Sequence, residues 1–302
     1  MSEKVQSAVL PARQWHERQA AHEARVDHWL GRHLARRRDG VKHPVEDFLF
    51  TYYSHRPAQL RRWHPGFGVV LADGPAQPPY VPAPGGTTVD PDLPHRRSDS
   101  IRWIRDLLAA TASRPPQLGC FGLHEWAMVY RQTQDQVRHN AWPLRLSPAA
   151  TAQVVEERGV RCTHFDAYRF FTEPARPLNI LTPTRDRQAE LEQPGCLHAT
   201  MDLYKWAYKL SPLVPSELVA DCFELSRAVR ELDMRASPYD LADLGYPPVR
   251  IETPEGRAAY ALSQKDFAER AAPLRARLIE ACDDLLIVSG SATGTPSRKR
   301  TG

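Results

Sequence analysis

Three apolar segments of the sequence each bring a histidine close to a carboxylate, and these residues have the types and spacing that suit catalysis. The pairs are His124 and Glu125 in FGLHEWAMVYR, His164 and Asp166 in RCTHFDAYRFF, and His198 and Asp202 in CLHATMDLYKWAYKL. An ionisable group buried in an apolar segment is costly unless it is paired, so such groups pair with one another, bind a metal or perform acid–base chemistry. We therefore take all six as candidate catalytic residues, with a buried hydrogen bond as the alternative for any single pair.

The spacing within a pair decides which element would hold both side chains on one face. His198 and Asp202 share a face of a helix, whereas His164 and Asp166 share a face only on a strand. If the pairs meet in one pocket, two chemistries compete. In the first, Asp166 or Asp202 activates water or stabilises an oxocarbenium-like centre while a histidine shuttles the proton. In the second, His164, Asp166 and His198 hold iron as a facial triad.

The metal-free chemistry is our first expectation. A His-x-carboxylate triad normally lies on the strands of a β-barrel, and the sequence lacks the regular alternating strands of a barrel. It also lacks the repeated Glu-x-x-His of a helical di-iron bundle. We therefore expect no cofactor and keep iron or zinc at His164, Asp166 and His198 as the alternative. The motifs of ATP hydrolysis, dinucleotide binding and serine hydrolysis are absent from the sequence.

Cations and aromatic rings near these pairs are the candidate substrate-binding residues. Arg169 lies three residues after Asp166 and Lys205 three after Asp202, so an intrahelical ion pair competes with phosphate binding at both positions. A second group of cations and rings is bunched around Pro57. The full set is Tyr53, His55, Arg56, Arg61, Arg62, Trp63, Trp126, Tyr130, Arg131, Arg169 and Lys205.

Three segments together resemble a known family. KHPVEDFLFTYYSHRPAQLRRWHPGFGVVL, GLHEWAMVYR and THFDAYRFFT are similar to an actinobacterial family that carries the name 3-methyladenine DNA glycosylase, over most of residues 10–290. The resemblance implies a hydrolase that cleaves the N-glycosidic bond of a damaged base in DNA. Such an enzyme flips the base from the stack, holds it between aromatic rings and attacks its sugar carbon with help from a carboxylate.

The resemblance carries over no catalytic residue by position. The chain lacks the L-P-G-V-G hairpin of helix-hairpin-helix glycosylases and the paired Cys and His ligands of the zinc-containing enzyme. A DNA glycosylase is the leading expectation. The alternatives are a metal-dependent enzyme acting on a small molecule or nucleotide, and a non-catalytic nucleic-acid-binding protein.

The composition fits a mildly basic globular protein. The 302 residues are 42% apolar, enough for a sizeable core, and carry a formal net charge of +4. Arginine supplies most of the positive charge and suits planar contacts with phosphate, so DNA or a nucleotide-like ligand is the expected partner. Neither a membrane-spanning stretch nor a secretory signal is evident, so we expect a cytoplasmic protein without membrane contact. The five scattered cysteines are expected to be buried free thiols.

Periodicity and turn signals predict one large, mainly α domain with a few short strands. Residues 11–288 are the expected catalytic domain, between a disordered N-terminus at 1–10 and a disordered basic tail at 289–302. Residues 73–100, rich in proline and glycine, are expected to form a long loop. Segment 159–171 is either a strand or a buried helix, and FGVVLA is a strand. Helices are predicted at 11–38, from Pro44 to a break at Pro57, and at 101–112, 121–138, 147–157, 196–210, 215–233 and 255–286.

Overall fold

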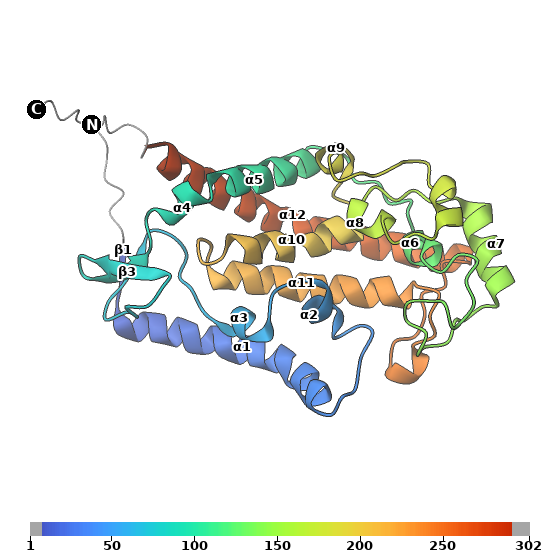
Figure 1. Cartoon of the computed structure of the whole chain (residues 1–302), viewed down its shortest axis with the longest axis horizontal. Helices are drawn as coiled ribbons and strands as arrows, with labels where there is room; N and C mark the ends of the chain where they lie inside the picture. The colour runs from blue at the N-terminus through green and yellow to red at the C-terminus, as the bar shows by residue number, and fades with distance from the viewer. Residues whose placement is uncertain (1–7, 292–302) are drawn as a thin grey trace, which may run out of the picture.

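Five long helices form the body of the protein (Figure 1). The computed structural model describes residues 8–291 of the chain. The long helices are α1 (Ala12–Arg38), α5 (Ser98–Ala112), α10 (Leu197–Leu210), α11 (Ser216–Arg235) and α12 (Pro254–Ser291). The prediction of a mainly α fold is confirmed, and each of these helices matches a predicted one to within a few residues. No helix within residues 8–291 has both the length and the apolar content that crossing a bilayer requires.

Helices α10 and α11 form a hairpin through the middle of the molecule. The turn at 211–215 reverses the chain, so the two helices lie side by side in opposite directions (Figure 1). Helix α10 is buried around almost its whole circumference, polar positions included. Helices buried on every side belong to the centre of a domain, and their polar groups must find partners there. The first turns of α10 and the last turns of α11 therefore place polar residues in the core, at the same end of the hairpin.

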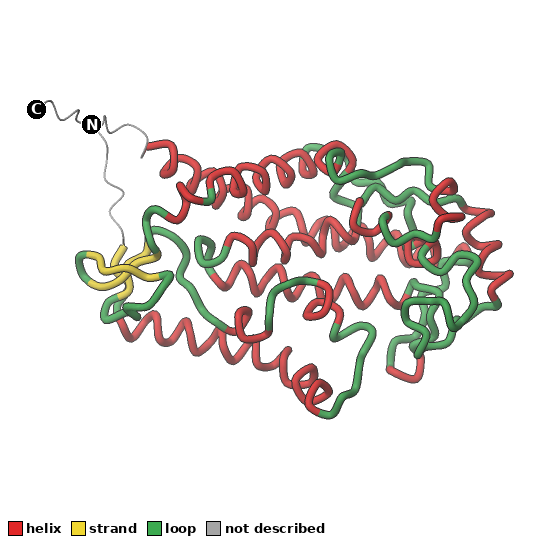
Figure 2. Tube along the Cα trace, in the orientation of Figure 1, coloured by secondary structure: helices red, strands yellow, loops and turns green. Residues whose placement is uncertain are grey.

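Short helices and loops surround that end of the hairpin (Figure 2). The chain changes direction every few residues in this region. Helices this short are not stable alone, so packing against α10 and α11 must hold them in place. The short helices of the chain are α2 (Phe48–Tyr52), α3 (Pro57–Arg61), α4 (Leu93–Arg96), α6 (Leu123–Ala127), α7 (Pro148–Arg158), α8 (Phe165–Tyr168) and α9 (Gln188–Leu191), with 3-10 turns η1 (Glu173–Leu178) and η2 (Ala242–Leu244).

A small sheet lies at the opposite end of the molecule from α6 and α7 (Figure 1). Its strand order is β1-β2-β4-β3, with β1 parallel to β2 and the other neighbours antiparallel. The strands are β1 (Ala8–Leu10), β2 (Val69–Leu71), β3 (Tyr80–Ala83) and β4 (Gly86–Val89). The strand predicted in FGVVLA is confirmed as β2.

The prediction of a long loop at 73–100 is wrong, because β3, β4, α4 and the start of α5 lie within it. Pro82 is tolerated because β3 is an edge strand, where a missing N–H breaks no ladder. Gly86 has a φ of +154°, and a side chain there would bring its Cβ to 1.9 Å from the Leu71 carbonyl oxygen. Glycine is therefore needed for the β3–β4 hairpin to pack on β2.

Two predicted helices are much shorter in the structure. The helix predicted at 121–138 contains only α6, because Phe121 and Arg131 have positive φ values of 46° and 56° that a right-handed helix cannot include. The helix predicted from Pro44 is reduced to α2. Pro57 begins α3, as a proline in the first turn of a helix can, and does not end the preceding helix.

Smaller corrections concern the ends of elements. Segment 159–171 contains one bridge at Val160 and the short helix α8. Ser147 caps α7 as predicted, accepting from the Ala150 N–H, whereas Ser216 accepts from the His64 N–H and does not cap α11. Within the predicted disordered ends, residues 8–10 form β1 and 289–291 belong to α12, while 1–7 and 292–302 lie outside the described residues.

All five cysteines are free, and all but Cys120 are buried. The expectation of free thiols is confirmed. The large apolar core joins α1, the α10–α11 hairpin, α5 and α12 into one cluster.

Candidate functional site

The three histidines singled out by the sequence meet in the core at the end of the α10–α11 hairpin. His124 lies in α6, His164 directly precedes α8, and His198 is in the first turn of α10. The ring centroid of His198 is 4.5 Å from that of His124 and 5.4 Å from that of His164. None of the three is more than 8% exposed. Three segments far apart in the sequence therefore converge on one buried centre.

The first buried group consists of His124, Glu125, His198 and Asp233. One nitrogen or oxygen of each residue lies within 4.8 Å of those of the others. His124 Nε2 is 2.8 Å from Asp233 Oδ1, and Arg230 Nη1 donates to Glu125 Oε1 at 3.0 Å and to Asp233 Oδ2 at 2.8 Å. The predicted pairing of His124 with Glu125 is therefore wrong, because Asp233 of α11 is the partner of His124.

The pKa values of the two carboxyls in this group are shifted in opposite directions. Burial, together with the negative charge of Asp233, raises the pKa of Glu125. Burial would also raise the pKa of Asp233, but the neighbouring His124 holds that pKa well below its usual range. Burial lowers the pKa of His198 well below its usual value, and the ring of His198 has no hydrogen bond to any residue between 8 and 291. The group therefore contains an ionised carboxylate beside a neutral imidazole.

The second buried group consists of His164, Glu192 and Asp202, with one ligand atom of each within 4.8 Å of the others. His164 Nε2 lies 3.2 Å from Glu192 Oε1 and 3.4 Å from Asp202 Oδ2, and neither contact has the geometry of a hydrogen bond. Burial would lower the pKa of His164, but the two carboxylates raise it to about 10. The predicted partner Asp166 does not contact this histidine, so that pairing is also wrong.

Asp166 is held by cations and lies outside both groups. Lys205 Nζ bridges Asp166 Oδ2 at 2.9 Å and Asp202 Oδ2 at 2.8 Å, and Arg169 Nε is 3.1 Å from Asp166 Oδ1. Both i, i+3 ion pairs expected from the sequence are therefore formed. A facial triad of His164, Asp166 and His198 is contradicted, because these three residues belong to three different clusters.

A cavity of about 500 Å³ opens onto the first group. Glu125, His198 and Arg230 form part of its wall, next to Asp166 and Arg169. The rest of the wall includes aromatic rings and one further arginine, which suit an organic anion, namely Phe48, Tyr52, Arg138, His139, Phe170 and Tyr239.

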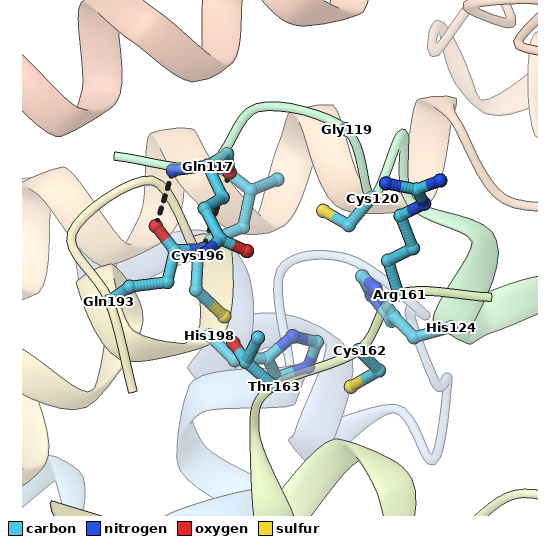
Figure 3. Close-up of a pocket in the computed structure, with 11 residues that line it drawn as sticks. Gln117, Gly119, Cys120, His124, Arg161, Cys162, Thr163, Gln193, Cys196 and His198 are labelled. Carbon is cyan, nitrogen blue, oxygen red and sulfur yellow. Dashed lines mark hydrogen bonds between the residues drawn. The ribbon is translucent and has the colours of Figure 1, made fainter. Parts of the chain in front are cut away.

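A second cavity, of about 300 Å³, lies against His124 and His198 (Figure 3). Three thiols line it, those of Cys120, Cys162 and Cys196. Burial raises the pKa of Cys162 to about 12, so its thiol is protonated at neutral pH. His198 is part of the wall of both cavities.

The predicted substrate-binding residues divide between this site and the rest of the molecule. Lys205 and Arg169 hold the carboxylates described above, and Tyr53 donates its hydroxyl to Asp202 Oδ1 at 2.8 Å. Arg169 lines the larger cavity, and among the described residues no other member of the predicted substrate-binding set lines either cavity.

Three of the predicted substrate-binding residues are core residues. His55 Nδ1 pairs with the Tyr204 hydroxyl at 2.9 Å, and Trp126 Nε1 donates to the Ala236 carbonyl. Trp63 Nε1 donates to a glutamate of α11. All three side chains are buried and line neither cavity, so the structure does not place them where they could contact a ligand as predicted.

The remaining predicted residues are placed away from the three histidines. Arg56 and Arg62 are exposed, and Arg61 pairs with two carboxylates of α1. Tyr130 and Arg131 both bond to one glutamate of α7. The cations bunched around Pro57 therefore do not face the buried centre.

Sequence reasoning did not identify Glu192, Arg230 or Arg138 as site residues, and it did not identify Asp233 as the partner of His124. Glu192 has no histidine near it in the sequence, and Asp233 is 109 residues from its partner His124. The one local signal was the pair Arg230 and Asp233, which lie three residues apart on α11, as an intrahelical ion pair requires.

The two groups contain the donors that transition metals and zinc prefer in proteins, imidazole nitrogen and carboxylate oxygen. The first group offers two imidazoles and two carboxylates, and the second offers one imidazole and two carboxylates. Comparisons of the chain with protein-family models, with curated proteins and with solved structures found no match.

Proposed function

We propose that this protein is a metal-dependent enzyme that acts on a small anionic substrate, with the metal bound by His124, Glu125, His198 and Asp233. The observation that carries the proposal is that four buried ligands converge within 4.8 Å and that two of them, Glu125 and His198, also line the larger cavity. A catalytic metal needs protein ligands on one side and an open position on the other. A divalent ion at such a position lowers the pKa of a bound water and polarises a substrate oxygen.

The cavity next to these ligands supports an anionic substrate. Its volume of about 500 Å³ is in the range of small-molecule sites. Arg138 stacks its guanidinium 4.7 Å from the ring centroid of Phe170 and has no ion-pair partner among the described residues. Guanidinium groups bind carboxylate and phosphate through paired hydrogen bonds, so we assign Arg138 to the anionic group of the substrate.

Asp166 is our candidate for acid–base work in this cavity. It lines the wall beside Glu125 and His198, and Lys205 and Arg169 fix its orientation. A carboxylate held by two donors is positioned to accept a proton from a water or a substrate hydroxyl.

A second candidate function, cleavage of an N-glycosidic bond, is favoured by the combination of rings, arginines and carboxylates in the same cavity. In this reaction Asp166 would assist attack at the sugar carbon of a nucleoside-like substrate. The alternative assignment of this role to Asp202 is not retained, because Asp202 is 2% exposed and lines neither cavity.

Metal analysis of the purified chain tests the leading proposal. We expect bound divalent metal after reconstitution with Zn(II), Mn(II) or Fe(II) and desalting, and loss of that metal in His124→Ala and Asp233→Asn. Asp243→Asn, an exposed change in the turn η2, is the control that should retain it. A protein that retains no metal yet releases alkylated bases from DNA would overturn the leading proposal in favour of the second.

A further inference from the structure

The second buried group lies beside the first and has no role in the function proposed above. Its members come from three elements: His164 precedes α8, Glu192 follows α9, and Asp202 is in α10. We propose that this group binds a second divalent cation, so that the protein holds a two-metal centre. His198 lies next to both His124 and His164, and so connects the two sites.

The spacing of the donor atoms fits a bound cation. In tetrahedral or octahedral sites with bonds of about 2.0–2.1 Å, neighbouring donor atoms are about 2.9–3.4 Å apart. His164 Nε2 is 3.2 Å from Glu192 Oε1 and 3.4 Å from Asp202 Oδ2. Two of the three donor separations therefore match those around a bound cation, and the third, between the two carboxylates, is within 4.8 Å.

The absence of a hydrogen bond from the His164 imidazole is an independent sign of a ligand. This residue is 1% exposed, and neither ring nitrogen has a hydrogen-bond partner among the described residues. Buried polar groups are rarely left without a partner. Nε2 faces two carboxylate oxygens without pointing an N–H at either, which is the arrangement of ligands around a shared cation.

Outer partners fix both carboxylates in place. Gln188 Nε2 donates to Glu192 Oε1 at 2.5 Å. Tyr53 donates to Asp202 Oδ1, and Lys205 Nζ donates to Asp202 Oδ2, each at 2.8 Å. Metal-ligating carboxylates are oriented by such outer hydrogen bonds, whose removal weakens metal binding.

The second site differs from the first in its access to substrate. His164, Glu192 and Asp202 line neither cavity, so a cation among them has no open face towards a substrate. Closed sites hold a structure together. Helices α8 and α9 have four residues each, too few to be stable alone, and a cation bound beside them would tie both to α10.

Metal stoichiometry on the full chain tests this inference separately from the proposed function. After removal of metal with EDTA, the protein is titrated with Zn(II) and the retained metal is measured by mass spectrometry. We expect two equivalents in the wild-type chain and one in Glu192→Gln. Glu190→Gln, an exposed change within the same helix α9, should retain both.

The outcomes separate the two proposals. One equivalent in the wild-type chain, lost in Asp233→Asn and kept in Glu192→Gln, overturns the second site and leaves the first intact. No metal in the wild-type chain overturns both. If Glu192→Gln does not fold, as judged by loss of its helical circular dichroism spectrum, His164→Gln is the variant tested in its place. The number of metal equivalents in the wild-type chain, one or two, still decides whether the second site exists.

Discussion

Replacing Tyr53 with phenylalanine removes the hydroxyl that donates to Asp202 Oδ1 at 2.8 Å. Tyr53 is 5% exposed and Asp202 is 2% exposed, so water does not readily replace the lost donor. A hydrogen bond to a charged group contributes about 1.5–3 kcal/mol, whereas a bond between neutral groups contributes about 0.5–1.5 kcal/mol. We therefore expect Tyr53→Phe to lower the free energy of unfolding of the metal-free protein by about 2 kcal/mol.

The matched control for this variant is Tyr80→Phe. Tyr80 is 7% exposed, and its hydroxyl is paired with a neutral acceptor, His64 Nδ1, at 2.9 Å. We expect it to lose about 1 kcal/mol. Urea unfolding followed by circular dichroism measures both, in buffer containing EDTA. If Tyr53→Phe costs no more than Tyr80→Phe, with unchanged slopes against urea, the hydroxyl does not stabilise a buried charge and our account of the Asp202 environment is wrong.

Three further predictions concern acid stability, the hairpin turn and the proposed anion site. Burial lowers the pKa of His64 to about 4, so between pH 6.5 and 4 the unfolded chain binds a proton that the folded chain does not. The free energy of unfolding therefore falls as the pH falls through this range. His64→Gln should lessen this pH dependence by up to about 1.4 kcal/mol per pH unit, as measured by urea unfolding at pH 7 and 4.5. Equal pH dependence in both proteins would contradict this. Gly86→Ala places a Cβ 1.9 Å from a carbonyl oxygen and should lower the free energy of unfolding by more than about 2 kcal/mol, with no change in metal content. Gly31→Ala, inside α1 with open space around it, should raise the free energy of unfolding by about 0.5–1 kcal/mol. Thermal melts of the two variants check the opposite signs. Arg138→Gln should weaken binding of pyrophosphate, measured by calorimetry, by about 10- to 100-fold while metal content stays constant; unchanged affinity would remove Arg138 from the proposed anion site.

The long helices could be predicted because their buried apolar residues recur in the sequence with the 3.6-residue period of an α-helix. Helix α5 shows this, since Ile101, Ile104, Leu107 and Leu108 mark its buried face in sequence and in structure alike. The apolar period does not predict where a helix ends when the backbone conformation of one residue sets that point. Arg131 is an example, because its left-handed conformation ends the helical segment. The sequence pattern also did not predict the edge strand β3, because proline and glycine are typical both of loops and of tight hairpins.

The histidines of the site were found because ionisable groups in apolar segments must be paired, and that argument needs no fold. Their partners were not found, because the argument leaves open which carboxylate does the pairing. Asp233 meets His124, and Glu192 meets His164, only after α6, α8 and α9 have packed around the hairpin. Sequence neighbours such as Glu125 and Asp166 instead bind the cations Arg230 and Lys205. The similarity to DNA glycosylases stays a prediction.

The buried thiols can report local opening of the folded protein. Only the thiolate reacts quickly with alkylating reagents, and burial keeps Cys162 and Cys282 protonated, with pKa values raised to about 12. Labelling of these cysteines therefore requires a local opening of the chain. Cys162 would report opening around the cavity beside His198, and Cys282 would report opening along α12. The two labelling rates, with and without added metal, would show which part of the fold a bound cation rigidifies.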